Sequence, residues 1–428
     1  MKDTLLLASD LHIGRSSSRL PDHARRAAFA AAAWARIVDL AVTESVSAVI
    51  LGGDVVDEDH RFWEAIGPLE SGIQRLAAAA IPVLAVAGNH DCAVLGRLAD
   101  LFPRDRFALL GRDGTWERFP LRQENGHAWL QVDGWSFPQS RVSHSPLNDY
   151  ALPPPIGDTP VLGLVHGDLG AAHSPYAPLE LARLQALHPQ AWLLGHIHAP
   201  RLATAPGRPW VLMPGSPQAL DPGETGPHGA WLATVEGAHI AAPVQRPLSS
   251  AWYEEAAVEL GEVSDEPTLE ATLLDALRSR AAEIGEQAGA ALAHVNVRLR
   301  LTGATPVADR VEAVAQRLRQ DLQLDAGPAS LAVDSIHNET LPALDLEQQA
   351  RTQTVLGAVA RLRLDLDKPH VSSETADLLE KTRQNLERAR NTKEFFLLPR
   401  DPHPDDPAKA LLKETATALL ARLAKEAE

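Results

Sequence analysis

The chain of 428 residues has almost no cysteine, since Cys92 is the only one. One cysteine cannot form a disulfide within the chain or supply the thiolates of a typical structural zinc site. Long apolar runs are also missing, and none approaches the roughly 18 residues that a membrane-spanning helix requires. The first predicted strand begins by Thr4, which leaves no room for a secretory signal peptide. The sequence therefore predicts a soluble, cytoplasmic protein with no membrane association.

Lysine is nearly absent from most of the chain. Lys2 is the only lysine before residue 368, and the other six lie from Lys368 onward, so the C-terminal part is a segment of a different kind. The formal net charge of −16 argues against nucleic-acid binding, because contacts with phosphates require basic residues. A DNA-binding role would need local arginine clusters or a basic partner protein.

Polar side chains follow five apolar runs, each of which has the composition of a buried strand. Such runs in α/β proteins deliver polar groups to the edge of a sheet, where sites lie. Carboxylate, amide and imidazole groups together suit Mn²⁺, Fe²⁺ or Zn²⁺. The sequence therefore predicts a metal site. The residues that close the five runs are Asp10 and His12 in DLH, Asp54 in GGD, Asn89 and His90 in GNHD, His166 in VHGD, and His196 and His198 in GHIH.

The ordered series DLH, GGD, GNHD, H and GHIH resembles the signature of the calcineurin-like metallophosphoesterases. The resemblance implies an α/β fold, a four-layer αββα sandwich, that binds two divalent metal ions. Mn²⁺ is the favoured ion, and Fe²⁺, Zn²⁺ and Mg²⁺ remain open. Two ions roughly 3.5–4 Å apart can activate water for in-line attack on a phosphate ester. The implied ligands are Asp10, His12, Asp54 and His198 for one ion, and Asp54, Asn89, His166 and His196 for the other, with Asp54 as the bridge.

Two further residues receive catalytic roles from this resemblance. His90 lies outside the ligand set and would stabilise the developing charge or protonate the leaving oxygen. Asp57 would orient His90, although its position before a predicted helix also suits a helix N-cap. Asp91 and Cys92 are interpreted as structural residues.

Three domains are predicted along the chain. Residues 1–248 contain the metal motifs and alternate between strands and helices, and the Pro- and Ser-bearing stretch 241–250 resembles a linker. Residues 252–337 follow a strand–helix–strand–helix–strand order, which predicts a small α+β domain. Residues 344–428 are predicted to form a helical extension, with helices at 344–363, 372–392 and 407–426.

The segment MPGSPQALDPGETGPHGAWLATVE at 213–236 resembles a part of the SbcD-type DNA repair nuclease subunits, and the chain is similar to their YhaO-like bacterial branch. The resemblance implies a metal-dependent DNA exonuclease or endonuclease, with the α+β domain capping DNA. It also implies a homodimer and a coiled-coil ABC-type ATPase partner of the SbcC kind. A small-molecule phosphodiesterase or phosphatase of the same superfamily is the alternative. The acidic pair Glu58 and Asp59 departs from the expected pattern, because it would repel a phosphate backbone.

The helical extension contains apolar residues that admit two interpretations. Leu378, Leu379 and Leu386 lie near one predicted helical face, and an apolar cluster follows at 395–398. These side chains either dock the ATPase or pack on the chain's own core.

Overall fold

A computed structural model describes residues 2–57, 62–155, 157–171, 173–322, 324–390 and 406–427. Glu58, Asp59 and the apolar cluster at 395–398 lie outside the described residues. The chain divides into two compact units. The first comprises Met1–Glu255, Ser279–Val297 and Gln323–Asp334, and the second comprises Ala256–Arg278, Arg298–Leu322 and Ser335–Glu428. The domain boundaries predicted from the sequence stay predictions.

A seven-stranded sheet forms one half of the sandwich, in the order β12-β11-β1-β2-β3-β4 with β13 also paired to β11. The strands β1, β2, β3 and β4 run parallel to one another. The strands β11, β12 and β13 are antiparallel to the strands with which they pair. The bounds are β1 (Lys2–Ala8), β2 (Ala48–Leu51), β3 (Val83–Ala85), β4 (Phe107–Leu109), β11 (Gly229–Glu236), β12 (His239–Ile240) and β13 (Val244–Pro247). The stretch predicted as a linker at 241–250 thus contains a strand. Proline does not prevent such pairing at an edge, where one side of the strand needs no partner.

The second sheet has six strands in the order β5-β6-β7-β8-β10-β9. The strands β6, β7, β8 and β10 are parallel, and β5 and β9 add antiparallel edges. The bounds are β5 (Glu117–Arg122), β6 (Ala128–Trp135), β7 (Val161–His166), β8 (Ala191–Gly195), β9 (Arg201–Ala203) and β10 (Trp210–Met213).

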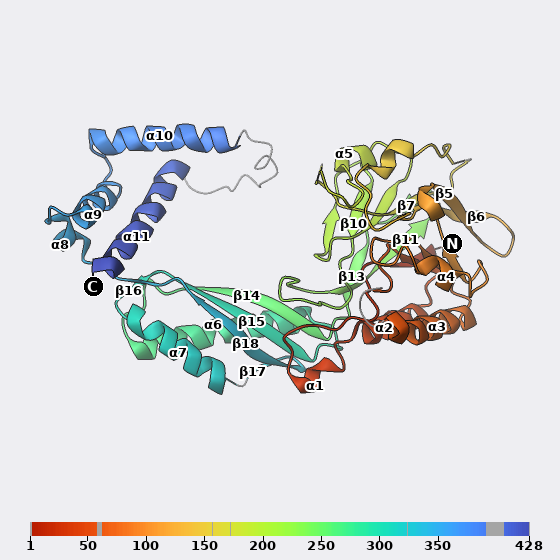
Figure 1. Ribbon diagram of the computed structural model, residues 1–428, viewed down its shortest axis with the longest axis horizontal. Helices are drawn as coiled ribbons and strands as arrows, with labels where there is room; N and C mark the ends of the chain where they lie inside the picture. The colour runs from red at the N-terminus through yellow and green to blue at the C-terminus, as the bar shows by residue number, and fades with distance from the viewer. Residues whose placement is uncertain are drawn as a thin grey trace. The chain divides into compact units, whose positions relative to one another are not determined.

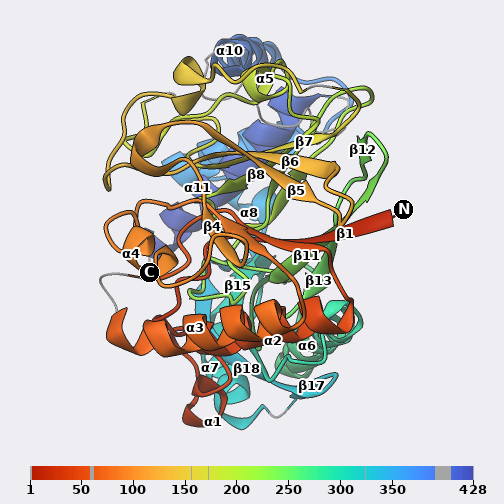
Figure 2. The same cartoon turned by 90° about the vertical axis from the view of Figure 1, so that its right-hand side faces the viewer.

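The two sheets stack face to face with helices outside them, as Figure 2 shows. Alternate residues of β1 divide between two cores: Leu6 packs towards α2 (Ala30–Thr43) and α3 (Phe62–Ala78), whereas Leu5 and Leu7 pack between the sheets. This alternation follows from the two-residue period of a strand. The outer face of the second sheet carries a smaller layer with α5 (Leu181–Leu184). The predicted αββα sandwich is confirmed.

A four-stranded sheet follows in the order β14-β15-β18-β17. In β15 the residues Val295, Val297, Leu299 and Leu301 are buried, as the alternating pattern predicts. The helices α6 and α7 lie between its strands in the sequence. The helix α6 buries an apolar stripe that includes Leu269, Leu273 and Leu277. The bounds are β14 (Ala251–Glu259), α6 (Glu266–Gln287), β15 (His294–Thr302), α7 (Ala308–Asp321), β17 (Leu324–Ala326) and β18 (Ala329–Asn338).

The C-terminal region is helical and is drawn in blue in Figure 1. Its helices are α8 (Leu346–Ala350), α9 (Val355–Asp365), α10 (Ser373–Arg390) and α11 (Pro407–Ala427). The single helix predicted at 344–363 is wrong, because the hydroxyl of Thr354 accepts a hydrogen bond from the backbone N–H of Gly357 and starts a new helix. Among the described residues, no helix combines the length and apolar character that crossing a bilayer requires.

Candidate metal centre

All seven predicted metal ligands follow the carboxyl ends of parallel strands from the two sheets. The first sheet supplies Asp10 and His12 after β1, Asp54 after β2 and Asn89 after β3. The second sheet supplies His166 at the end of β7, and His196 and His198 after β8. Because the strands of each sheet end at the same edge, stacking the sheets brings these side chains together.

The backbone of four ligands has an unusual conformation. The φ angles of Asp10, His12, Asp54 and His196 are 54°, 46°, 49° and 97°. Residues other than glycine rarely adopt positive φ, and such strain concentrates at functional sites. Hydrogen bonds between neighbouring loops hold it in place: the N–H of Asp10 donates to the carbonyl of Gly53 at 3.0 Å, and that of His12 to Asp54 at 2.9 Å.

Asp10, His12 and His198 form the first cluster of ligand atoms, all within 4.8 Å of one another. The Nε2 atoms of His12 and His198 are 3.1 Å apart. Asp10 is fully buried, and its carboxylate accepts hydrogen bonds from the Ser9 hydroxyl at 2.6 Å and the His196 N–H at 3.0 Å. These contacts fix the orientation of the carboxylate.

Asp10, Asp54 and His166 form a second cluster within the same distance. The Oδ2 atom of Asp54 is 3.4 Å from Nε2 of His166 and 3.8 Å from Nε2 of His12, so it lies between the two sets of ligands. The Oδ1 atom of Asn89 is 3.1 Å from Nε2 of His166 and 3.2 Å from Nδ1 of His196. The structure thus brings all seven predicted ligands into one centre.

The chemistry of this donor set fits two divalent ions. Two imidazole nitrogens that face each other, as in His12 and His198, can share only one proton, whereas a cation between them satisfies both lone pairs. Buried carboxylates likewise need a positive partner. Oxygen and imidazole ligands without thiolates match Mn²⁺, Fe²⁺ or Zn²⁺.

Residues 4–200 match the calcineurin-like phosphoesterase family. All seven predicted ligands lie within these matched residues. Family members use a dinuclear metal centre to hydrolyse phosphate esters, and the chain has the corresponding His/Asp cluster. Residues 253–341 match the middle domain of the metallophosphoesterase YhaO.

Two curated relatives share part of their sequence with this chain. The uncharacterized metallophosphoesterase YhaO of Bacillus subtilis is 28% identical over 270 residues, which are 61% of this chain and 64% of that protein. The DNA double-strand break repair protein Mre11 of Haloferax volcanii is 31% identical over 223 residues, 51% and 46% of the two chains. The chain thus covers less than two thirds of either relative. Among solved structures, a dimetal phosphatase from Danio rerio aligns with a TM-score of 0.34 and 15% identity, over 58% of this chain and 99% of its own.

Neighbouring charges shift the pKa values of several residues in the candidate metal centre. Burial lowers the pKa of His166, but the neighbouring Asp54 carboxylate outweighs this effect and raises it to about 9. Burial alone would raise the pKa of Asp54, yet His166, His12 and His90 hold it well below its usual range. Burial lowers the pKa of His196. Asp54 is therefore ionised, as its predicted bridging role requires.

His90 lies at the centre but contacts Asp54 through its backbone. Its N–H donates to Oδ1 of Asp54 at 2.9 Å, and its half-buried ring is 5.0 Å from the ring of His12. Asp57 is fully buried, and its Oδ2 is 3.4 Å from Nδ1 of His12. Ligand atoms of His12, Asp57 and His90 all lie within 4.8 Å of one another. The catalytic roles of His90 and Asp57 stay predictions, and the geometry adds His12 as a residue that Asp57 can orient.

Asp91 ties together the two loops that carry Asp54 and Asn89. One carboxylate oxygen accepts the N–H of Val55 and the other accepts that of Gly88, both at 2.7 Å. Burial and the nearby Asp54 carboxylate raise the pKa of Asp91 to about 7. These backbone contacts agree with the structural interpretation of Asp91.

Glu224 is a site residue that the sequence analysis did not identify. Its Oε1 lies 2.7 Å from Nδ1 of His198, and its Oε2 accepts hydrogen bonds from the Ser216 hydroxyl at 2.7 Å and the Leu220 N–H at 2.8 Å. A carboxylate on the second nitrogen of a ligating histidine fixes the ring and its tautomer. The only signal in the sequence was an acidic residue within the 213–236 segment.

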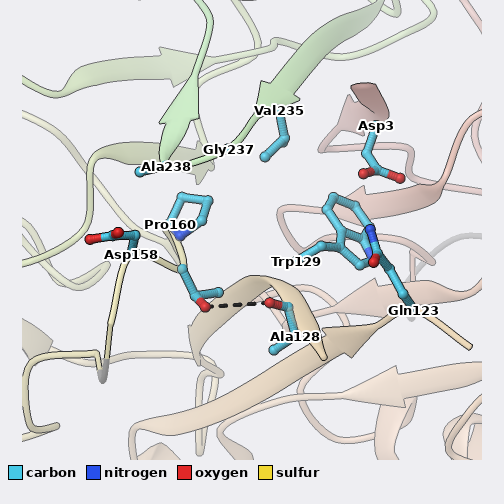
Figure 3. A pocket seen from close by; sticks show the side chains of 10 residues that line it. Asp3, Gln123, Ala128, Trp129, Asp158, Pro160, Val235, Gly237 and Ala238 are labelled. Carbon is cyan, nitrogen blue, oxygen red and sulfur yellow. Dashed lines mark hydrogen bonds between the residues drawn. The ribbon is translucent and has the colours of Figure 1, made fainter. Parts of the chain in front are cut away.

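One cavity lies away from the metal centre. It has a volume of about 460 Å³ and is lined by residues such as Asp3 at the start of β1, Ala128 at the start of β6 and Gly237 after β11 (Figure 3). These residues mark the amino ends of the parallel strands, whereas the ligands follow the carboxyl ends. No predicted site residue lines this cavity, so it is separate from the phosphoesterase chemistry.

Proposed function

We propose that the protein is a two-metal DNA nuclease, an exonuclease or endonuclease, that hydrolyses phosphodiester bonds in DNA repair and recombination in the cytoplasm. The observation that carries this proposal is the 31% identity with a DNA double-strand break repair protein, Mre11 of Haloferax volcanii, over 223 residues. The match of residues 253–341 to the YhaO middle domain supports a second domain in addition to the one that carries the metal centre, and this second domain would cap the DNA.

The residues of the centre have distinct tasks in this proposal. Asp10, His12, Asp54 and His198 would hold one ion, and Asp54, Asn89, His166 and His196 would hold the other. When bound, the ions polarise the phosphate and lower the pKa of a coordinated water. His90 presents its half-buried imidazole beside the ligands, where it can donate a proton to the leaving oxygen. Mn²⁺ is the ion we propose, on the basis of the mixed oxygen and nitrogen ligands.

We also propose a coiled-coil ABC-type ATPase as partner and a homodimer as the assembled form. The net charge of −16 supports a partner that contributes basic surface for DNA. Apolar side chains are exposed on the C-terminal helices: Val355 is 68% exposed and Leu419 44%. Such side chains suit docking on another protein.

A comparison of substrates tests this function. The purified protein is incubated with Mn²⁺ and with one of three substrates: linear DNA, circular DNA or the small diester bis(4-nitrophenyl) phosphate. Cleavage of DNA at a rate well above that of the diester is the expected result. Hydrolysis of the small diester without cleavage of either DNA would instead support the alternative, a small-molecule phosphodiesterase.

Asp54→Ala tests the bridging role. It removes the carboxylate that lies between the two ligand sets, so we expect hydrolysis to be abolished and bound metal to fall to one ion or fewer. Elemental analysis and the DNA assay measure both effects. Asp105→Ala, at an exposed aspartate, is the control. A variant with two bound ions and retained activity would disprove the bridge.

A further inference from the structure

A second cavity lies next to the metal centre. Its volume is about 370 Å³, within the range of small-molecule sites. Its walls come from the loop between β1 and α2 and from the first turns of α2 and α3. The lining residues are Gly14, Arg15, Arg26, Phe29, Ala31, Ala32 and Glu64.

Two side chains, Arg15 and Asp57, connect this cavity to the metal ligand His12. Arg15 follows the ligand His12 in the chain, and its N–H donates to the carbonyl of His12 at 2.9 Å. The Nε atom of Arg15 is 3.9 Å from Oδ2 of Asp57, which is itself 3.4 Å from Nδ1 of His12. The cavity therefore lies close to a metal ligand, at the end of a short chain of charged contacts.

The charged groups of the cavity suit an anionic ligand. Arg26 is exposed and forms no ion pair within the described part of the chain, whereas Arg15 is paired with Asp221 at 3.2 Å. A guanidinium group binds phosphate through two parallel hydrogen bonds. Phe29 adds a half-buried aromatic ring, on which a base or sugar can pack. Glu64 is the one carboxylate among the lining residues.

The loop that forms the cavity is held in place from several directions. The N–H of Ala30 donates to the carbonyl of Arg15 at 3.0 Å, and the N–H of Ser17 donates to that of Ala28 at 3.0 Å. The hydroxyl of Tyr253 donates to the carbonyl of Ser18 at 2.5 Å. The cavity is therefore formed before a ligand binds, which reduces the entropy lost on binding.

We propose that this cavity is a subsite for one nucleotide that flanks the scissile phosphodiester. Arg26 binds the phosphate of that nucleotide, and Phe29 packs against its base or sugar. Arg15 lines the part of the cavity that is near the metal ligand His12. The inference rests on the proposed nuclease function, because the subsite is defined relative to a phosphodiester held at the metal centre. It makes Arg26 a residue that selects nucleotide substrates over small esters.

Arg26→Ala is the test variant and Arg25→Ala its matched control. Arg25 is the adjacent exposed arginine, which pairs with Asp22 at 3.1 Å and does not line the cavity. For each protein, kcat/KM is measured with Mn²⁺ for a short single-stranded oligonucleotide and for bis(4-nitrophenyl) phosphate. We expect the ratio of the two values to fall about 10-fold or more in Arg26→Ala, the effect of one lost charged hydrogen bond, and to stay at the wild-type value in Arg25→Ala.

Binding of deoxyadenosine 5′-monophosphate, measured by calorimetry, separates this inference from the proposed function. Weaker binding in Arg26→Ala than in Arg25→Ala supports the subsite even if no protein cleaves DNA, in which case the nuclease function alone would fail. An unchanged substrate ratio together with unchanged nucleotide binding in Arg26→Ala would overturn the subsite, whether or not the wild-type protein cleaves DNA.

Discussion

At the scale of single residues, the candidate metal centre contains seven predicted ligands and a further residue, His90, whose hydrogen bond to the ligand Asp54 comes from its backbone. Because the N–H of His90 supplies the hydrogen bond to Asp54, a change of its side chain preserves that contact. We expect His90→Asn to keep the bound metal and to lose about 10²–10⁴-fold in turnover, the usual contribution of a general acid.

Metal analysis and steady-state kinetics check this prediction. His144→Asn, at an exposed histidine, is the control and should retain wild-type turnover. If His90→Asn lost its metal, His90 would belong to the ligand set and the role assigned to it would be wrong.

Glu224 acts at the same scale, through the orientation of His198. Replacing it by glutamine keeps the size of the side chain but removes the negative charge from Nδ1 of His198. We expect Glu224→Gln to weaken metal binding about 10–100-fold, as is typical when the partner of a ligating histidine is changed. A competition titration with a metal-binding dye measures the affinity. Glu236→Gln, at an exposed glutamate, should bind metal as the wild type does, and equal affinity in both variants would exclude the positioning role.

At the scale of elements, glycines at strand ends allow the two sheets to meet. A Cβ on Gly195, at the end of β8, would lie 2.1 Å from the carbonyl oxygen of Gly52 after β2 and 2.5 Å from Nδ1 of His166. Gly195→Ala must therefore push the sheets apart where they supply ligands from both sides. We expect it to lose bound metal and about 1–3 kcal/mol of unfolding free energy, the usual cost of overpacking.

Gly67→Ala, in α3, is the contrast for this prediction. A Cβ there meets no atom within 4 Å, and alanine favours a helix over glycine by up to about 1 kcal/mol. Denaturant unfolding and metal analysis of both variants compare the two positions. Full metal content in Gly195→Ala would show that the sheets can separate without disturbing the ligands.

At the scale of the whole molecule, the helical extension packs on itself. Leu379 and Leu386 of α10 lie in a cluster with Leu366 and with Ala408 of α11, so these two leucines are used within the extension. Leu378 is 37% exposed. Leu379 and Leu386 thus follow the packing interpretation, and the docking interpretation stays a prediction.

Truncation tests the docking role of the extension. A cut after residue 370 would uncover Leu366, so a cut after Ala343, before α8, removes the helices as a group. We expect the shortened protein to keep metal-dependent cleavage of short single strands. It should lose co-purification with the ATPase and any ATP-stimulated cleavage of duplex DNA. Unchanged affinity for the ATPase, or outright unfolding, would contradict the docking role.

The sequence by itself located the strand ends that carry the predicted ligands, and the resemblance of their motifs to a known family implied the sandwich. Each motif follows an apolar run, and a parallel strand that is buried on both faces requires such a run. The ends of these strands can therefore be recognised from the neighbouring residues in the sequence. The break between α8 and α9 was missed because it depends on a threonine cap within a stretch that otherwise favours a helix.

Only the tertiary structure decided which of these groups touch. The 3.1 Å approach of His12 to His198 and the position of Glu224 behind His198 depend on how two sheets stack. The cavity at Arg26 depends on the path of a loop between β1 and α2. Contacts between residues far apart in the chain leave no periodic pattern in a single sequence, because periodicity records only which face of an element is buried.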